Sequence, residues 1–235
     1  MAELYRVQGR YSEAEPLYKE ALAIRKQQLG DNHPDVAQSL NNLAELYLSQ
    51  GRYSEAEPLY KEALDIFKQQ LGDNHPSTAA SLNNLAFLYR IQGRYSEAEP
   101  LLKQSLAIRK QQLGDNHPDT AQSLNNLAGL YQSQGRYSEA EPLYKEALFI
   151  FKQQLGNNHP DVAQTLNNLA TLYWNQGKYP EADELFSQGL QVEEYNFSQN
   201  LIAGDEFQKQ AYIAIYSGTI DTVISRSLQS IPRAC

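Results

Sequence analysis

The sequence predicts an all-α fold in which antiparallel helix pairs stack side by side into a solenoid. Glycine recurs at a constant step of 42 residues, at Gly9, Gly51, Gly93, Gly135 and Gly177. All four histidines keep the same step, and each precedes a proline. Every period also contains two apolar stripes at helical spacing, and a helix pair of this kind cannot bury its stripes without stacking on neighbouring pairs.

The repeats are nearly identical, which indicates that each is a copy of one helix pair. Residues 35–76 and 119–160 differ at five positions: Val36/Thr120, Glu45/Gly129, Leu48/Gln132, Asp65/Phe149 and Asp73/Asn157. Such near-identity suggests recent duplication, so the interpretation of one repeat applies to the others.

The first helix of a repeat is predicted by the spacing of Leu40, Leu43, Ala44 and Tyr47, which places four apolar residues on one buried stripe. Gly51 ends this helix, because glycine tolerates the left-handed conformation found at helix ends.

The second helix is expected to open at Ser54, with Glu57 completing a capping box three residues later. Pro58 follows the first turn, where it removes at most one helical hydrogen bond. The apolar stripe of this helix comprises Ala56, Leu59, Tyr60, Ala63, Leu64 and Phe67. Gly72 closes the helix, and His75-Pro76 leads into the next repeat, with the proline suited to a first helical position.

Residues 40–64 resemble the tetratricopeptide repeat through the motifs Leu-Asn-Asn-Leu-Ala-Glu-Leu-Tyr and Gln-Gly-Arg-Tyr-Ser-Glu-Ala-Glu-Pro-Leu-Tyr-Lys-Glu-Ala-Leu. The 42-residue period, with Leu-Gly-Asp-Asn-His-Pro in the connection, is similar to the kinesin light chain type of this repeat. The resemblance covers Ala2 to about Glu194 and implies a right-handed superhelix whose concave groove is lined by the first helix of each repeat. It predicts a partial repeat at 1–34, repeats at 35–76, 77–118, 119–160 and 161–194, and a helical extension at 195–235.

The segment after the repeats is expected to form two short helices, Asp205–Tyr216 and Thr219–Gln229. Residues 200–219 are similar to the stretch that leads into a caspase-like CHAT domain in cyanobacterial repeat proteins. The catalytic part of such a domain would lie beyond this sequence. The resemblance implies one alternative function, a sensor arm of a larger CHAT protein.

Charge and composition exclude several classes of function. The chain has 20 Lys and Arg against 28 Asp and Glu, a net charge of −8. This balance disfavours binding to nucleic acid or to an anionic membrane, because both need a basic surface. The sequence has no apolar run of the roughly 20 residues that span a membrane and no signal-peptide pattern. Its single cysteine, Cys235, cannot form an internal disulfide, so we expect a cytoplasmic protein.

Metal binding and catalysis are not expected. Packed helices lie roughly 10 Å apart, whereas zinc holds nitrogen ligands at about 2 Å, so histidines of successive repeats cannot share an ion. Each His-Pro pair is instead expected to start a helix. The sequence shows no glycine-rich phosphate loop and no arguable Ser-His-Asp arrangement, so we expect neither an enzyme nor a cofactor site.

Paired asparagines in the middle of each first helix are anomalous, because asparagine is a poor helix former. On a helical wheel one member of each pair lies opposite the buried stripe and should face the groove. This groove set, which is expected to bind the backbone of an extended peptide, comprises Asn42, Asn84, Asn126 and Asn168. The other member should contact the neighbouring repeat, as part of an amide ladder. This flank set comprises Asn41, Asn83, Asn125 and Asn167.

Three groove-side positions vary on an otherwise constant frame, as a non-repetitive ligand would require. They are Glu45/Phe87/Gly129/Thr171, Leu48/Arg90/Gln132/Trp174 and Ser49/Ile91/Ser133/Asn175. We expect ligand contacts from Glu45, Phe87, Arg90, Ile91, Gln132, Thr171, Trp174 and Asn175. The outer-face residues Asp65, Ala107 and Phe149 vary as well, so neutral drift at exposed positions is an alternative explanation.

The sequence therefore predicts a scaffold that binds a peptide or protein segment in its groove. Phe87, Ile91 and Trp174 favour apolar or aromatic anchors in the ligand. Only Arg6 and Arg90 supply groove cations, which disfavours a strongly acidic ligand. A further alternative is an array that self-associates through unsealed ends, because residues 1–5 align with 43–47 and the first repeat lacks half of its first helix.

Overall fold

The structure is a computed structural model that describes the backbone of residues 1–203 and the side chains of residues 1–199. This part of the chain is entirely helical and contains no strand. Its helices are α1 (Ala2–Val7), α2 (Tyr11–Leu29), α3 (Pro34–Ser49), α4 (Tyr53–Leu71), α5 (Pro76–Ile91), α6 (Tyr95–Leu113), α7 (Pro118–Ser133), α8 (Tyr137–Leu155), α9 (Pro160–Asn175) and α10 (Tyr179–Ala203). No helix among them is both long and apolar enough to cross a membrane.

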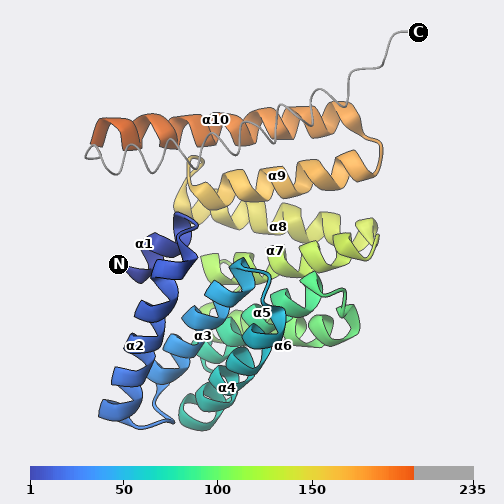
Figure 1. Cartoon of the computed structure of the whole chain (residues 1–235). Coiled ribbons are helices and arrows are strands. Elements are labelled where there is room, and N and C mark those ends of the chain that lie inside the picture. The colour runs from blue at the N-terminus through green and yellow to red at the C-terminus, as the bar shows by residue number, and fades with distance from the viewer. Residues whose placement is uncertain (204–235) are drawn as a thin grey trace.

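The helices form consecutive pairs that stack side by side, which confirms the predicted fold class. The closest contacts join α3 to α4, α5 to α6, α7 to α8 and α9 to α10, and each pair also contacts the next pair along the chain (Figure 1). Helix α10 runs without interruption past Glu194 to Ala203. The two helices predicted further on, at 205–216 and 219–229, lie outside the described residues.

The apolar stripe of the first helix is buried as predicted. Leu40, Leu43, Ala44 and Tyr47 are all at most 6% exposed. The helix ends at Ser49, and two residues later Gly51 has a φ of 72°, in the left-handed region that a residue with a side chain rarely adopts. The sequence therefore determines both the buried face and the end of this helix.

The start of the second helix differs from the prediction. The helix begins at Tyr53. Its N-cap residue is Arg52, whose side chain forms no capping hydrogen bond with the backbone. The Arg52 guanidinium instead donates to both carboxylate oxygens of Glu55, at 2.7 and 2.6 Å. The expected capping box of Ser54 and Glu57 is wrong, because Glu57 is engaged by the next repeat.

Glu57 belongs to an ionic contact that joins successive repeats and that we call the inter-repeat clasp. Its carboxylate accepts a hydrogen bond of 2.7 Å from Arg94 of the next repeat, and the Arg94 guanidinium carbon lies 4.0 Å from the centroid of the Tyr89 ring. The hydrogen bond from Arg94 lowers the pKa of Glu57 to about 2. The clasp recurs as Glu15/Arg52/Tyr47 and Glu99/Arg136/Tyr131.

Leu85→Ala should lower the free energy of unfolding by about 2–5 kcal/mol, because it empties space in the stripe of a central repeat. Leu85 is 4% exposed, whereas Phe149, on the outer face, is 61% exposed. Phe149→Ala is therefore the control, with an expected change within about 0.5 kcal/mol. Chemical denaturation of both variants measures the difference, and equal stabilities would contradict the stripe assignment.

Glu57→Gln should destabilise the protein by about 1 kcal/mol at neutral pH, as expected for a half-buried ionic hydrogen bond. Because the folded-state pKa is depressed, the stabilisation is present above the ordinary value of 4.5 and is lost as the pH falls to about 2. The stabilities of wild type and variant should therefore converge across that window. Denaturation curves recorded over this range test the prediction, with Asp65→Asn on the outer face as the control.

Candidate functional site

The first helices line the inner side of the stack. Helix α3 contacts α5, α5 contacts α7 and α7 contacts α9, whereas the second helices α4, α6 and α8 make no comparable contact with one another. In a curved stack the helices approach most closely on the inner side. We therefore call the solvent-facing positions of α3, α5, α7 and α9 the inner surface.

The groove set of asparagines faces this inner surface. Asn84 is exposed and the other three are half-buried. A glutamine one turn earlier donates to two of them: Gln38 binds the Oδ1 of Asn42 at 2.9 Å, and Gln122 binds the Oδ1 of Asn126 at 3.1 Å. Both bonds engage the amide oxygen, so the amide NH2 groups remain the donors that these residues present.

Two members of the flank set, Asn83 and Asn125, contact the neighbouring repeat as predicted. Asn83 is buried and donates to the Ser123 hydroxyl of the next repeat at 3.1 Å. Asn125 is also buried and accepts a hydrogen bond of 3.2 Å from Asn168, a member of the groove set. These contacts link one first helix to the next.

An amide ladder is present only in part among the described residues. One amide–amide hydrogen bond joins two layers, from Asn168 to Asn125. Asn83 instead donates to a serine, and Asn167 donates to Glu193 of α10 at 3.0 Å, because these oxygen acceptors lie within reach of their amides.

Several residues at the variable positions are engaged by the chain itself. The carboxylate of Glu45 forms an ion pair of 3.1 Å with Arg6 of the preceding repeat. Thr171 donates to the Asn167 carbonyl within its own helix at 2.8 Å. Two more of these side chains have partners of their own. Gln132 accepts a hydrogen bond of 2.8 Å from the Tyr144 hydroxyl, and the Trp174 ring lies edge-on to Tyr179 with centroids 4.9 Å apart.

Five of the twelve predicted contact residues are exposed to solvent: Glu45, Asn84, Phe87, Ile91 and Asn175. Phe87 and Ile91 are 40% and 41% exposed, which is high for large apolar side chains. Asn175 is exposed in the last turn of α9. Phe87 and Ile91 lie one turn apart on α5 and form the apolar part of the inner surface.

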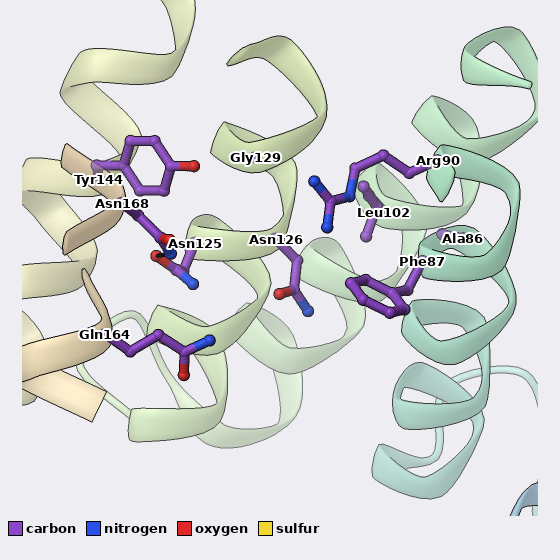
Figure 2. A pocket seen from close by; sticks show the side chains of 10 residues that line it. All are labelled: Ala86, Phe87, Arg90, Leu102, Asn125, Asn126, Gly129, Tyr144, Gln164 and Asn168. Carbon is purple, nitrogen blue, oxygen red and sulfur yellow. Dashed lines mark hydrogen bonds between the residues drawn. The ribbon is translucent and has the colours of Figure 1, made fainter. Parts of the chain in front are cut away.

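A cavity of about 120 Å³ opens between α5, α7 and α9 (Figure 2). Its walls combine an apolar ring, several amides and one cation. They comprise Ala86, Phe87, Arg90, Leu102, Asn125, Asn126, Gly129, Tyr144, Gln164 and Asn168. The cavity thus brings together four predicted contact residues, namely Phe87, Arg90, Asn126 and Asn168. The other eight do not line it.

The guanidinium of Arg90 gives the cavity its charge. It extends from α5 toward α7, beside Phe87, and Nη1 donates to the Ser133 hydroxyl at 3.4 Å (Figure 2). Burial lowers the pKa of Arg90, yet a guanidinium stays protonated at neutral pH. Burial also raises the pKa of Tyr144 to about 12, so its hydroxyl remains a neutral donor.

Sequence reasoning missed Leu102, Tyr144 and Gln164 as cavity residues. Leu102 could have been found by comparing the repeats, because Tyr18, Tyr60 and Tyr144 occupy the equivalent position in other repeats. Tyr144 and Gln164 carry no such signal, since each is the residue that two other repeats share, Tyr18 and Tyr60 or Gln38 and Gln122, and they reach the cavity only through the stacking of repeats.

The histidines start helices, as predicted. His75 is the N-cap of α5, and its Nδ1 accepts a hydrogen bond of 3.1 Å from the Ser77 amide. The other three histidines cap α3, α7 and α9 in the same way. Within residues 1–199, no group of three or more His, Cys, Asp or Glu side chains is placed to hold a metal ion.

The sequence profile of the tetratricopeptide repeat matches residues 1–69, 50–111, 77–153 and 119–192, which together span most of the chain. The chain belongs to the tetratricopeptide repeat family. No curated protein sequence matches it.

Several solved structures resemble the chain over most of its length. BtubC (BKLC) from P. vanneervenii is 28% identical with a TM-score of 0.68, over 83% of this chain and 77% of that one. A kinesin light chain protein of Podosopora anserina with nearly identical TPR-like repeats is 32% identical with a TM-score of 0.64, over 83% and 92%. A Rap protein solved with Competence and Sporulation Factor shares the fold at 21% identity and a TM-score of 0.72, over 92% and 62%.

His75→Ala should destabilise the tetratricopeptide array by about 1 kcal/mol, because it removes the acceptor that caps α5. His75→Asn should preserve most of the stability, since asparagine also caps helices.

Added zinc should leave the thermal midpoint of the wild-type protein unchanged. Thermal unfolding measures all three effects, and a saturable shift with stoichiometric zinc would contradict the capping role.

Proposed function

We propose that this tetratricopeptide array is a scaffold that binds an extended peptide or protein segment along its inner surface. One observation carries the proposal: exposed apolar side chains and free amide donors lie next to each other on the helices that line the inner side. Phe87 and Ile91 supply the apolar contacts, and Asn84 supplies an exposed amide on the same helix.

The chemistry of these side chains suits a polypeptide ligand. An asparagine amide can donate to a backbone carbonyl and accept from a backbone N–H, so a row of amides can follow an extended chain. A partly exposed aromatic ring beside them favours an apolar anchor in the ligand, because buried aromatic contacts commonly dominate interface energies. The varied residues between the amides would then set which sequence binds.

The frame behind the inner surface supports binding at low entropic cost. The first-helix stripes of α3, α5 and α7 are buried, that of α9 is buried except for the half-buried Tyr173, and the inter-repeat clasp joins successive pairs. A surface that is ordered before the ligand arrives loses less conformational freedom on binding. Glu45, Gln132, Thr171 and Trp174 would contribute by shaping the surface, because each already contacts another residue of the chain.

Asn84→Ala combined with Asn126→Ala should weaken binding of peptides selected by the wild-type protein from a random library. Each lost amide should cost about 1–3 kcal/mol where it leaves a backbone group of the ligand unsatisfied. Stability should hold or rise slightly, because alanine is the better helix former. Titration calorimetry and thermal unfolding of the same double variant measure both quantities.

Asn83→Ala is the matched control, because Asn83 lies in the same helix but is buried against Ser123. This variant should lose stability and keep its affinity for the selected peptides. If the double variant instead loses stability while its affinity is unchanged, the groove set does not form the binding surface.

A further inference from the structure

Comparison of two equivalent arginines shows that one of them has lost its internal anions. Arg6 and Arg90 occupy the same position two repeats apart. Arg6 forms ion pairs with Glu3, one turn earlier, and with Glu45 of the following repeat, at 3.1 Å for the latter. The hydrogen bond with Glu3 raises the pKa of Arg6. This arginine is therefore held in the stack by two carboxylates.

At Arg90 both carboxylates are replaced. Phe87 stands at the position of Glu3, and Gly129 stands at the position of Glu45. In the described residues Arg90 forms no ion pair with a carboxylate; its contacts are the Ser133 hydroxyl at 3.4 Å and the Phe87 ring, whose centroid lies 5.0 Å from the guanidinium carbon. A half-buried cation without a counter-charge is unfavourable, so this arrangement stabilises an incoming anion.

Gly129 opens the space that such an anion would occupy. A methyl group added at Gly129 would lie 3.4 Å from the Tyr144 hydroxyl oxygen and 3.6 Å from Nη1 of Arg90, which are ordinary contact distances. Alanine would therefore fit, and it is the better helix former. What opens the site beside Arg90 is thus the loss of the carboxylate and of the side-chain atoms beyond Cβ that Glu45 has beside Arg6, rather than the lack of a methyl group.

The same repeat has a third replacement that fits this interpretation. Tyr18 donates to Glu3 at 2.6 Å beside Arg6, whereas the equivalent residue beside Arg90 is Leu102, which has no hydroxyl. The residues that complement an internal carboxylate are thus absent where the carboxylate is absent. The arginine alone is retained, and it lines a cavity of about 120 Å³.

We propose that Arg90 and the open position at Gly129 form a subsite for one carboxylate side chain of the bound segment, an aspartate or a glutamate. The ligand carboxylate takes the place that Glu45 occupies beside Arg6, and the Tyr144 hydroxyl and the Asn126 amide lie on the walls around it (Figure 2). Phe87 packs against the methylene groups of the same side chain. The subsite rests on the proposed function, and it adds one acidic residue to an otherwise apolar and amide-binding surface.

Two libraries of short random peptides with amidated C-termini test the subsite, one with a fixed central glutamate and one with glutamine. The wild-type protein should enrich the glutamate library at least about tenfold, as expected for charge-assisted hydrogen bonds. Arg90→Gln should abolish the preference. This variant copies Gln132, the residue that the next repeat carries at the equivalent position, and it should therefore fold; its thermal midpoint checks this.

Substitutions at Gly129 provide the matched pair. Gly129→Glu supplies an internal carboxylate like that of Glu45, so it should abolish the preference for glutamate and raise the thermal midpoint. Gly129→Ala improves the helix without adding a charge, so it should keep the preference. Loss of the preference in both variants would show that the site is sensitive to volume alone and would overturn the proposal.

The remaining outcomes separate the subsite from the proposed function. Equal binding of both libraries by the wild-type protein overturns the subsite and leaves peptide binding intact. If neither library binds, the proposed peptide binding is wrong. The subsite is then tested separately, by following the NMR signal of the Arg90 side chain during titration with acetyl-glutamate amide or acetyl-glutamine amide. A shift with glutamate alone supports it, and no shift overturns it. A stronger response to peptides with a free C-terminus than to the amidated glutamate peptides overturns the side-chain assignment.

Discussion

Burial of each helix pair against the next is the interaction on which the rest of the structure depends. Residues such as Leu40, Leu43, Leu82 and Leu85 are almost completely inaccessible, and the core clusters that contain them include side chains from more than one helix pair. A single pair could not bury both stripes, so each repeat folds in the context of its neighbours. This requirement fixes the period of the sequence, because any change in helix length would displace every later stripe.

The same requirement explains where the repeats are free to differ. Stripe positions contact two layers at once and are kept nearly constant, whereas a residue on the inner surface contacts at most the edges of adjacent layers. Glu45 can therefore become Phe87 or Gly129 without moving the helices. The inter-repeat clasp is intermediate in how far its residues vary between repeats. It joins layers through Glu57 and Arg94. Where α10 begins, Lys178 replaces the arginine, with a longer separation of 3.9 Å from Glu141.

The sequence predicts the helices and their buried faces well because periodicity and helix ends depend on local residues. Spacing alone identified the first-helix stripe, the glycine ends and the histidine caps. It failed for Glu57, which was assigned to a capping box although its partner Arg94 lies 37 residues further on. Only some of the residues that line the cavity could be predicted. Tyr144 and Gln164 reach it from different repeats, and neither residue looks unusual within its own repeat.

Arg90 shows how a repeat array can exchange an internal contact for an open site without altering its fold. Arg6 shows the filled arrangement, an arginine positioned between layers and matched by carboxylates, Glu45 among them. At Arg90 these carboxylates are absent, which leaves a half-buried cation that is costly in isolation. The array tolerates this cost because its stability comes from the buried apolar stripes. The cation at Arg90 is consequently preorganised, and an anion that binds there regains the contact that the neighbouring repeat no longer provides.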